Sequence, residues 1–547
     1  MANAQEINSD DHLWYKDAVF YEVNVKAFFD SNSDGHGDLP GLIQKLDYLH
    51  ELGVDCLWLQ PMYPSPLRDD GYDISDFYSL LPKYGTVDDL KRLLDRAHAL
   101  GMRIIMDLVM NHTSDQHPWF QAARADRNSP YRDYYVWSDT DQKYQEARII
   151  FLDTEPSNWS WDEVAGQYYW HRFYASQPDL NYDSPAVQAE MLSIIQYWLE
   201  LGIDGFRADA IPYLFEREGT NGENLPETHL YLKKVRQFID ENYPGRILLA
   251  EANQWPEDVR EYFGNGSDEF HMGFHFPLMP RIYKSLKTGE RSSLEWILEK
   301  TPALPEQCQW CTFLRNHDEL TLEMVTEEER QWMWEKYAPD PRMRLNLGIR
   351  RRLAPLLDND RAKIELANSL LFTMQGSPIL YYGDEIGMGD NIWLFDRNGV
   401  RTPMQWDSSP KAGFSDAPME NYYAPLIESA EYGSQKVNVT DQRSDPHSLY
   451  NSLRHMIAIR KLHPAFGRGS FAWMGDNPHV AAYLRSYDRE RLLIVNNLSA
   501  ENQEINIELD NLSGEPVDLL TGRAILGVSA GRMKLRLQPY AILWLRI

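Results

Sequence analysis

The feature that most constrains this chain is a series of short strand-type segments that alternate with longer helix-type segments. Such alternation is typical of βα units around a parallel sheet. Eight units in one domain predict an α/β fold, a (β/α)₈ barrel with its reactive side chains at the carboxyl ends of the strands. The expected strands are Ala18–Val25, Cys56–Gln60, Arg103–Val109, Gly205–Asp209, Ile247–Glu251, Glu269–Phe276, Thr312–Asn316 and Pro378–Tyr382.

Two of the intervening helices have clear start and stop signals. Thr86 can cap a helix that begins at Val87 and ends before Gly101. Ser184 can cap a second helix, which has Pro185 in its first turn and Gly202 at its end. Caps, an early proline and a terminal glycine are the usual boundaries of helices.

The alternation is interrupted twice and ends before the C-terminus. Residues 111–181 are aromatic, rich in Asp, Ser and Pro, and too long for one helix, so they predict an inserted subdomain. The barrel then comprises residues 1–110 and 182–464, with an Arg-rich excursion near 319–360 that is expected to be a solvated helical insertion. Residues 465–547 show a period of two, which predicts a C-terminal antiparallel β-sandwich domain.

Composition excludes several classes of function. The chain has 54 Lys and Arg against 82 Asp and Glu, a net charge of −28 that repels nucleic acids and anionic membranes. The longest apolar stretches, such as Ile104–Met110, are far shorter than the roughly 20 residues that span a bilayer. The polar start, Met1–Asp11, lacks the features of a signal peptide, so a cytoplasmic location is expected.

Three carboxylates are expected at one rim of the barrel. Asp209 ends the fourth strand, Glu251 ends the fifth, and Asp318 follows the seventh. A single Asp at a strand end is more often a helix cap or an ion-pair partner. Several together suit glycoside chemistry, in which one carboxylate attacks the anomeric carbon and another protonates the leaving oxygen.

Five ordered motifs carry a resemblance to a known family. Four of them resemble the signature regions of the α-amylase superfamily, glycoside hydrolase family 13, and the fifth, Gln177–Asn181, resembles the branch that holds α-glucosidases and oligo-1,6-glucosidases. The four are Asp107–His112, Gly205–Asp209, Ala250–Glu251 and Asn316–Asp318. The resemblance implies that Asp209 is the nucleophile, Glu251 the general acid/base and Asp318 the carboxylate that stabilises the transition state.

The neighbouring residues fit those roles. Arg207 lies two residues before Asp209, on the same strand face, and can keep that carboxylate ionised. Glu251 has no cation within two residues, so its pKa is free to rise as an acid requires.

The resemblance also implies a closed glucose subsite. Asp69 would clamp the non-reducing glucose and Tyr72 would stack on it, with a cation opposite Asp69; Arg401 is the candidate and Arg397 its rival. A closed end would confine the pocket to short sugars. Further sugar contacts are expected from His112, Gln177 and His317.

Two structural metal sites are expected. Asp30, Asn32, Asp34, the His36 carbonyl and Asp38 match the first half of an EF-hand loop and indicate Ca²⁺ or Mg²⁺, although Gly41 replaces the final Glu and a plain turn is the alternative. A second Ca²⁺ is implied only by the resemblance. Its expected ligands are Asn111 and Asp179, with carbonyls near Tyr213, Leu214 and Glu216. No organic cofactor is expected.

Four longer strings are similar to the trehalose synthases, the maltose α-glucosyltransferases of this family. They are Ala250–Asp258, Asn316–Thr321, Arg350–Asp360 and Tyr381–Asn391. The reaction that this implies is a retaining isomerisation of maltose to trehalose, with minor hydrolysis to glucose. An isomerase must exclude water, so residues that grip the departing glucose matter. The candidates are Arg148, Asn253, Glu319 and Glu323.

Two alternatives remain at this stage. The nearer is an α-glucosidase that hydrolyses maltose or isomaltose, and the farther is a non-catalytic sugar-binding subunit on the same barrel. The expected partners are small disaccharides, with neither nucleic acid nor membrane. The sequence leaves the oligomeric state open, a homo-oligomer included.

Overall fold

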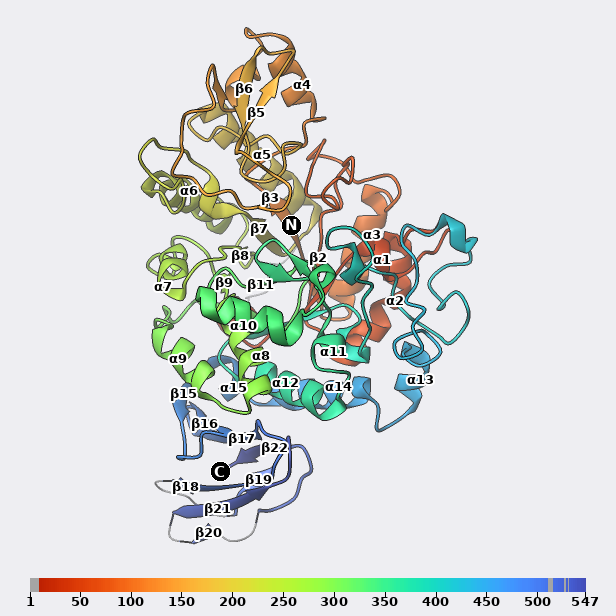
Figure 1. Cartoon of the computed structure of the whole chain (residues 1–547), viewed down its shortest axis with the longest axis vertical. Coiled ribbons are helices and arrows are strands. Elements are labelled where there is room, and N and C mark those ends of the chain that lie inside the picture. Colours follow the sequence, from red (N-terminus) through yellow and green to blue (C-terminus); the bar gives the residue numbers. More distant parts are fainter. Residues whose placement is uncertain (1–8, 510–514, 526–527, 530) are drawn as a thin grey trace, which may run out of the picture.

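Eight parallel strands close into a barrel at the centre of the molecule (Figure 1). The computed structural model describes residues 9–509, 515–525, 528–529 and 531–547, so most of the polar stretch Met1–Asp11 lies outside the described residues. The strand order is β1-β14-β10-β9-β8-β7-β3-β2. Their bounds are β1 Phe20–Val23, β2 Cys56–Leu59, β3 Arg103–Val109, β7 Gly205–Asp209, β8 Ile247–Ala250, β9 Met272–Phe274, β10 Gln309–Phe313 and β14 Ser377–Tyr381.

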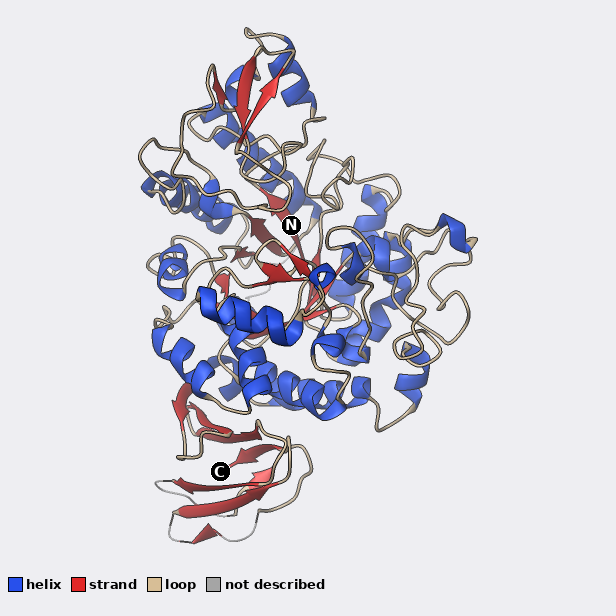
Figure 2. Cartoon of the chain, viewed as in Figure 1, coloured by secondary structure: helices blue, strands red, loops and turns tan. Residues whose placement is uncertain are grey.

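Helices surround the barrel and connect its strands (Figure 2). They include α2 Leu39–Leu52, α3 Val87–Ala99, α5 Pro185–Leu201, α6 Pro226–Asn242, α7 Pro256–Val259, α8 Leu278–Thr288, α9 Ser292–Lys300, α12 Arg361–Thr373 and α14 Leu449–Leu462. Thr86 forms a capping box with Asp89 at the start of α3. Ser184 lies at the N-cap of α5 but makes no side-chain cap hydrogen bond, while Gly202 ends that helix at a φ of 110°.

The barrel and the antiparallel domain that follows it confirm the predicted fold class. One expected strand differs in position: the strand predicted at Thr312–Asn316 lies earlier in the chain, as β10, Gln309–Phe313. Gln309 looks polar in sequence, but its buried amide donates to the Lys16 and Gly467 carbonyl oxygens. The Asn316–Asp318 motif therefore follows the strand as a loop above the barrel.

Residues 111–181 project from the barrel at the top of Figure 1. They contain α4 Pro118–Ala125 and a three-stranded sheet in the order β4-β6-β5. The strands are β4 Trp137–Ser138, β6 Gln167–Trp170 and β5 Trp159–Asp162. Backbone bridges close this segment on itself, because His112 pairs with Asp179 and Tyr135 with Leu180. Its first residues follow the carboxyl end of β3 directly, and the Ser114 N–H donates to the Ile74 carbonyl outside the segment at 2.7 Å.

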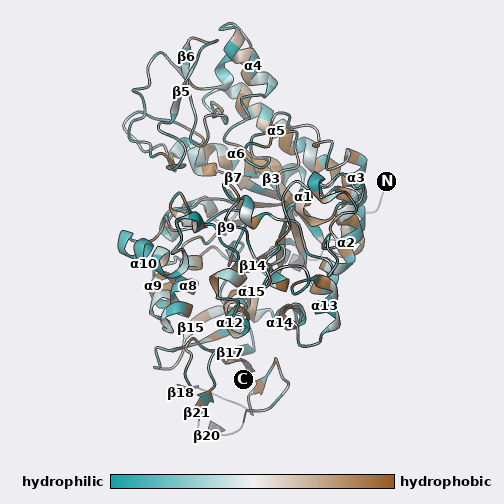
Figure 3. Ribbon diagram, turned by 45° about the vertical axis from the view of Figure 1, so that its right-hand side comes forward, coloured by the Kyte–Doolittle hydropathy of each residue, from teal (hydrophilic) through white to brown (hydrophobic). Residues whose placement is uncertain are grey.

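The excursion after β10 contains a partly exposed helix and a small sheet. Figure 3 shows hydrophilic colouring on α10 Glu327–Tyr337, of which only Met333 and Tyr337 are buried. The sheet has the order β11-β13-β12, from β11 Leu320–Thr321, β13 Gly348–Ile349 and β12 Arg344–Leu345. The short helix α11 Leu353–Leu356 leads back to α12.

The C-terminal part forms two antiparallel sheets packed on a separate core. Residues Met533, Leu535 and Leu537 of β21 are buried and alternate with exposed cations, as the period of two predicts. Trp544 binds the Ser369 hydroxyl of α12 at 2.9 Å, which docks this domain on the barrel. The strands are β15 Ser470–Trp473, β16 Val480–Tyr487, β17 Glu490–Asn497, β18 Gln503–Glu508, β19 Val517–Asp518, β20 Val528–Ser529, β21 Arg532–Leu537 and β22 Ile542–Arg546.

No helix in the described ranges is both long and apolar enough to cross a membrane.

Candidate functional site

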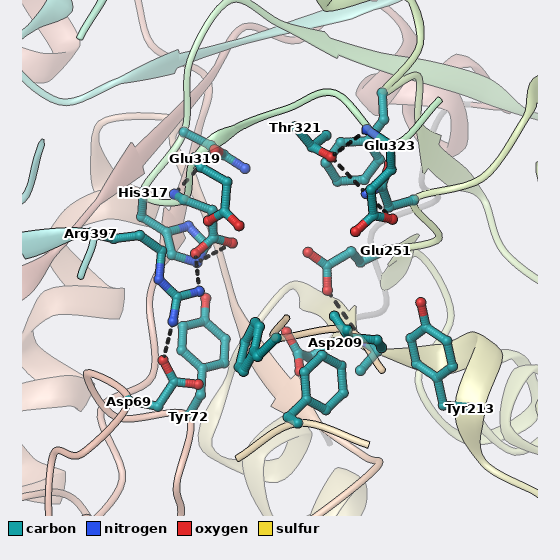
Figure 4. A pocket seen from close by; sticks show the side chains of 18 of the residues that line it. Asp69, Tyr72, Asp209, Tyr213, Glu251, His317, Glu319, Thr321, Glu323 and Arg397 are labelled. Carbon is teal, nitrogen blue, oxygen red and sulfur yellow. Dashed lines mark hydrogen bonds and ion pairs between the residues drawn. The ribbon is translucent and has the colours of Figure 1, made fainter. Parts of the chain in front are cut away.

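A single cavity above the carboxyl ends of the strands holds Asp209, Glu251 and Asp318 together. Asp209 is the last residue of β7, Glu251 follows β8 directly, and Asp318 lies in the loop after β10. Figure 4 shows the labelled side chains around this space. The other lining residues are Asp69, Tyr72, His112, Ile150, Phe151, Phe173, Ala210, Tyr213, Asn253, Phe276, Asn316, His317, Glu319, Thr321, Glu323 and Arg397.

Arg207 pairs with both carboxylates at the base of the cavity. Its guanidinium lies 2.5 Å from Asp107 and 2.5 Å from Asp209, and it also donates to Glu251. The sequence has no cation within two residues of Glu251, but the fold brings Arg207 to it from the adjacent strand. Arg207 is in register with Leu249 of β8, two residues before Glu251, so the two side chains face the same way.

The two carboxyl groups nevertheless differ in acidity. Burial raises the pKa of Glu251 to about 8, against the lowering effect of Arg207. Burial also raises the pKa of Asp209, to about 6, while Arg207 lowers it and so favours the ionised form, as expected. Two neighbouring carboxyls whose pKa values are pushed apart form the arrangement that acid and nucleophile roles require.

Asp318 is the most acidic of the three. Burial alone would raise its pKa, but His317, Arg397 and Arg401 together lower it well below its usual range. Arg397 lies 2.9 Å and Arg401 3.1 Å from the same carboxylate oxygen. Asp318 therefore remains an anion that can accept hydrogen bonds from sugar hydroxyls.

The cation opposite Asp69 is Arg397, and the expectation of Arg401 is corrected. Arg397 contacts the Asp69 carboxylate at 2.6 Å, and Gln177 donates to the other oxygen at 2.9 Å. Arg401 instead contacts Asp70 at 3.1 Å. Because Asp69, Arg397 and Asp318 form one chain of ion pairs, this end of the cavity is closed by charged groups.

The aromatic wall of the same end contains Tyr72 and the two predicted histidines. Tyr72 stacks on His317, with ring centroids 5.2 Å apart. His317 lies 2.5 Å from Glu22 through one ring nitrogen and 3.2 Å from Asp318 through the other. Burial lowers the pKa of His112 to about 3, so it is neutral, and its Nε2 has no protein partner.

Several lining residues were not identified from the sequence. Phe151, Phe173 and Phe276 supply apolar surface but belong to no recognised motif. Glu22, whose carboxylate contacts a ring nitrogen of His317, is fully buried in the otherwise apolar strand β1. A lone Glu in such a strand is a usable signal, because a buried charge is retained only with partners.

The acceptor candidates are only partly at the cavity. Asn253, Glu319 and Glu323 line it, whereas Arg148 is not among the described lining residues. Arg148 contacts Glu223 at 2.7 Å and Glu323 at 2.9 Å. Asn253 donates to the same Glu323 carboxylate at 3.1 Å. Arg148 thus holds Glu323 from outside and links residues 111–181 to the excursion.

The EF-hand-like loop satisfies its own oxygens. The Asp30 carboxylate accepts the backbone N–H groups of Asn32, Ser33 and Gly35, and Asp38 accepts that of Gly41 at the start of α2. Asn32 and Asp34 accept backbone N–H groups two residues on, the latter from His36. These contacts are those of the plain turn, and this loop offers no buried oxygen that lacks a partner among its described ligand residues.

The second expected metal site differs in this respect. One side-chain oxygen each of Asn111, Asp179 and Glu216 is buried without a hydrogen-bond partner. Burial raises the pKa of Asp179 to about 8, and burial and Asp179 raise that of Glu216. Tyr213 and Leu214 lie in the turn just before Glu216. Oxygen ligands of this kind suit Ca²⁺, although no group of three or more His, Cys, Asp or Glu side chains in the described chain is arranged to hold a metal.

Comparison with known proteins gives consistent matches. The family described as alpha amylase, catalytic domain, matches residues 23–339 and 349–469, and that described as maltogenic amylase, C-terminal domain, matches 472–544. A trehalose synthase/amylase of Mycobacterium tuberculosis is 60% identical over 93% of this chain and 86% of its own. A trehalose synthase of Pimelobacter is 55% identical over 98% and 96%. The trehalulose synthase of Pseudomonas mesoacidophila, a solved structure, matches with a TM-score of 0.78 and 28% identity over 97% and 99%.

Proposed function

Because the chain belongs to the α-amylase family, we propose that it isomerises maltose to trehalose by moving a glucosyl group within one bound disaccharide. The observation that carries the proposal is the set of three carboxylates around one cavity whose far end is closed by Arg397 and Asp69. High identity to two trehalose synthases supports the choice of reaction within the family.

The first half of the proposed reaction breaks the glycosidic bond. Glu251 gives its proton to the glycosidic oxygen while a carboxylate oxygen of Asp209 attacks the anomeric carbon. The bond from that carbon to the glycosidic oxygen breaks, a bond to Asp209 forms, and free glucose carries the proton. The pKa values of about 8 and about 6 support this division of roles at neutral pH.

The second half reverses these roles with a different nucleophile. The retained glucose turns and its anomeric hydroxyl attacks the glucosyl carbon. Glu251 takes the hydroxyl proton, and Asp209 leaves as a carboxylate. Two displacements retain the configuration at the transferred carbon, so the product is trehalose. Arg207 and the anionic Asp318 stabilise the positive charge and the carboxylates through both steps.

Water competes with glucose for the intermediate, and its attack gives the minor hydrolysis product. The contacts of Arg148 with Glu323 and of Asp153 with Asn346 support a closed outer wall. A wall that holds the freed glucose favours its attack over that of water. Asn253 and Glu319, which line the cavity, are the proposed contacts for this glucose.

We also propose a structural cation, Ca²⁺ by preference, among Asn111, Asp179 and Glu216, with carbonyls of Tyr213 and Leu214. The three unpartnered oxygens support it. The ion would neutralise buried acidic groups and pin residues 111–181 to the barrel. An ion in the Asp30–Asp38 loop, Ca²⁺ or Mg²⁺, stays a prediction. The proposed partners are the disaccharides alone.

Proton NMR of the purified protein with maltose as the only sugar tests the function. The expected result is growth of the trehalose anomeric signal with a smaller amount of glucose. Glucose as the sole product would instead support the α-glucosidase alternative. Asp209→Ala is the control, and unchanged conversion by that variant would rule out the proposed chemistry.

A further inference from the structure

Three consecutive arginines, Arg350, Arg351 and Arg352, follow β13 in the excursion. Their sequence suggests a solvated surface, yet Arg352 is fully buried and the other two are partly buried. All three side chains bind one later segment of the chain, residues 382–396, which follows β14. That segment ends directly before Arg397, the cation of the glucose subsite.

The first two attachments fix the beginning and middle of this segment. Arg352 donates to the Tyr382 carbonyl at 2.7 Å and contacts Asp384 at 3.1 Å. Arg351 lies 2.9 Å from both carboxylate oxygens of Asp390. The backbone N–H of Arg352 also donates to Asp390, at 2.7 Å. Each of these cations has a carboxylate partner, so their roles are explained by charge pairing.

Arg350 is different because its partners are backbone carbonyls. Its guanidinium donates to Ile392 at 3.2 Å, to Leu394 at 2.7 Å and to Asp396. Its Nε donates to the Arg342 carbonyl at 2.6 Å, within the excursion. Among the described residues, no carboxylate forms an ion pair with Arg350 at salt-bridge distance. A planar fork with five donors can hold several carbonyls in a fixed arrangement, which a lysine cannot do.

The last of those carbonyls adjoins Arg397. Asp396 has a φ of 52°, a left-handed conformation that is uncommon for a non-glycine residue although Asp adopts it more readily than most. Arg397 then reaches Asp69 and Asp318. These ion pairs form a bridge from Asp69 through Arg397 to Asp318. The Asp318 end is also linked to the three arginines, because Arg315 donates to the Asp318 carbonyl and, at 2.6 Å, to the Arg351 carbonyl.

We propose that Arg350 is a positioning residue for the glucose subsite: it holds residues 392–396 so that the Arg397 guanidinium stands between Asp69 and Asp318. This inference rests on the proposed function for its substrate, although the subsite would serve any α-glucoside. Without Arg350, residues 392–396 lose the hydrogen bonds that fix them, and the Arg397 guanidinium loses its fixed position between Asp69 and Asp318. A displacement of about 1 Å in such a group can lower the rate about a hundredfold.

A double-mutant cycle between Arg350 and Arg397 tests the proposal. Activity is measured with 4-nitrophenyl α-glucoside, whose hydrolysis needs only the glucosyl subsite. Arg350→Met is expected to lower kcat/KM about ten- to a hundredfold, through both a higher KM and a lower kcat, because Arg397 contacts Asp69 and Asp318. Because both residues act through one bridge, the double variant is expected to be no worse than Arg397→Met alone. Losses that multiply in the double variant would overturn the proposal.

Arg344→Met is the matched control, since the Arg344 guanidinium binds the Ala338 carbonyl inside the excursion. Equal activities of Arg344→Met and Arg350→Met would overturn the proposal. Arg350→Lys keeps the charge but not the fork, and is expected to recover only part of the loss; full recovery would contradict the carbonyl contacts as the cause. This variant replaces Arg350→Met in the cycle if the latter does not fold. If maltose gives no trehalose signal, the proposed function is wrong. The double-mutant cycle still tests the role of Arg350, because it is measured with 4-nitrophenyl α-glucoside.

Discussion

The backbone N–H of Asn346 donates a 2.8 Å hydrogen bond to the carboxylate of Asp153, and the Asp153 N–H donates back to the Asn346 side chain at 3.4 Å. This exchange joins residues 111–181 to the excursion. Asn346 also donates to Glu319, which lines the cavity, at 3.1 Å. One residue in the turn between β12 and β13 therefore connects the outer wall with the acceptor side of the site.

Removing this contact should let water in without disturbing the carboxylates. Asp153→Ala is expected to raise the ratio of glucose to trehalose formed from maltose roughly fivefold, since one hydrogen bond contributes about 1 kcal/mol net. The ratio is read by proton NMR at equal conversion. Asp126→Ala, an exposed Asp elsewhere in residues 111–181, is the control. An unchanged ratio in Asp153→Ala would show that this contact does not restrict water.

The pH dependence of kcat/KM on maltose follows from the two carboxyls that carry the chemistry. Asp209 must be ionised, so activity should rise as pH increases through about 6. Glu251 must be protonated, so activity should fall as pH increases through about 8. The two groups interact, so the limbs belong to the pair. A profile that stays flat between pH 5 and 9 would contradict this assignment.

Sequence patterns located the barrel because its strands are buried runs with regular spacing. The exception, β10, begins at a polar residue whose partners, Lys16 and Gly467, come from distant segments. The three carboxylates could likewise be predicted to share one rim, because parallel strands place their carboxyl ends together. The order of the motifs along the chain was enough to assign each of the three carboxylates to its strand end.

The partners of those carboxylates could not be predicted in the same way. Arg397 and not Arg401 faces Asp69 because the segment before it is held by arginines some 45 residues earlier in the chain. Arg207 on β7 contacts Glu251, which follows the adjacent strand β8, and this contact depends on the register of the two strands and not on neighbours in the sequence. Both differences arise where tertiary contacts choose between similar cations.

Metal removal should distinguish the two expected cation sites. A chelator is expected to lower the Tm by a few degrees, and Ca²⁺ to restore it, because an ion that binds only the folded state stabilises it. Asp179→Asn should weaken this response, since it removes charge beside unpartnered buried oxygens. Asp34→Asn is the comparison, because the Asp34 carboxylate is engaged by the His36 N–H. A response lost only in Asp34→Asn would assign the ion to the EF-hand-like loop instead.

The contacts of Arg207 predict how the whole pH profile is set. Its guanidinium reaches Asp107, Asp209 and Glu251 together, and it lowers the pKa of both catalytic carboxyls. A lysine has a single nitrogen that cannot span three carboxylates. Arg207→Lys is therefore expected to lower kcat about a hundredfold and to move both limbs of the profile to higher pH.

The control for this variant is Arg236→Lys, because Arg236 is also buried but pairs with Asp240 on α6, away from the cavity. Its pH limbs should remain where they are in the parent protein, whatever the change in Tm. If Arg207→Lys loses activity with both limbs unmoved, Arg207 stabilises the fold but does not set the acidity of the pair. If only the limb near pH 8 moves, the cation acts on Glu251 alone, and burial by itself sets the pKa of Asp209.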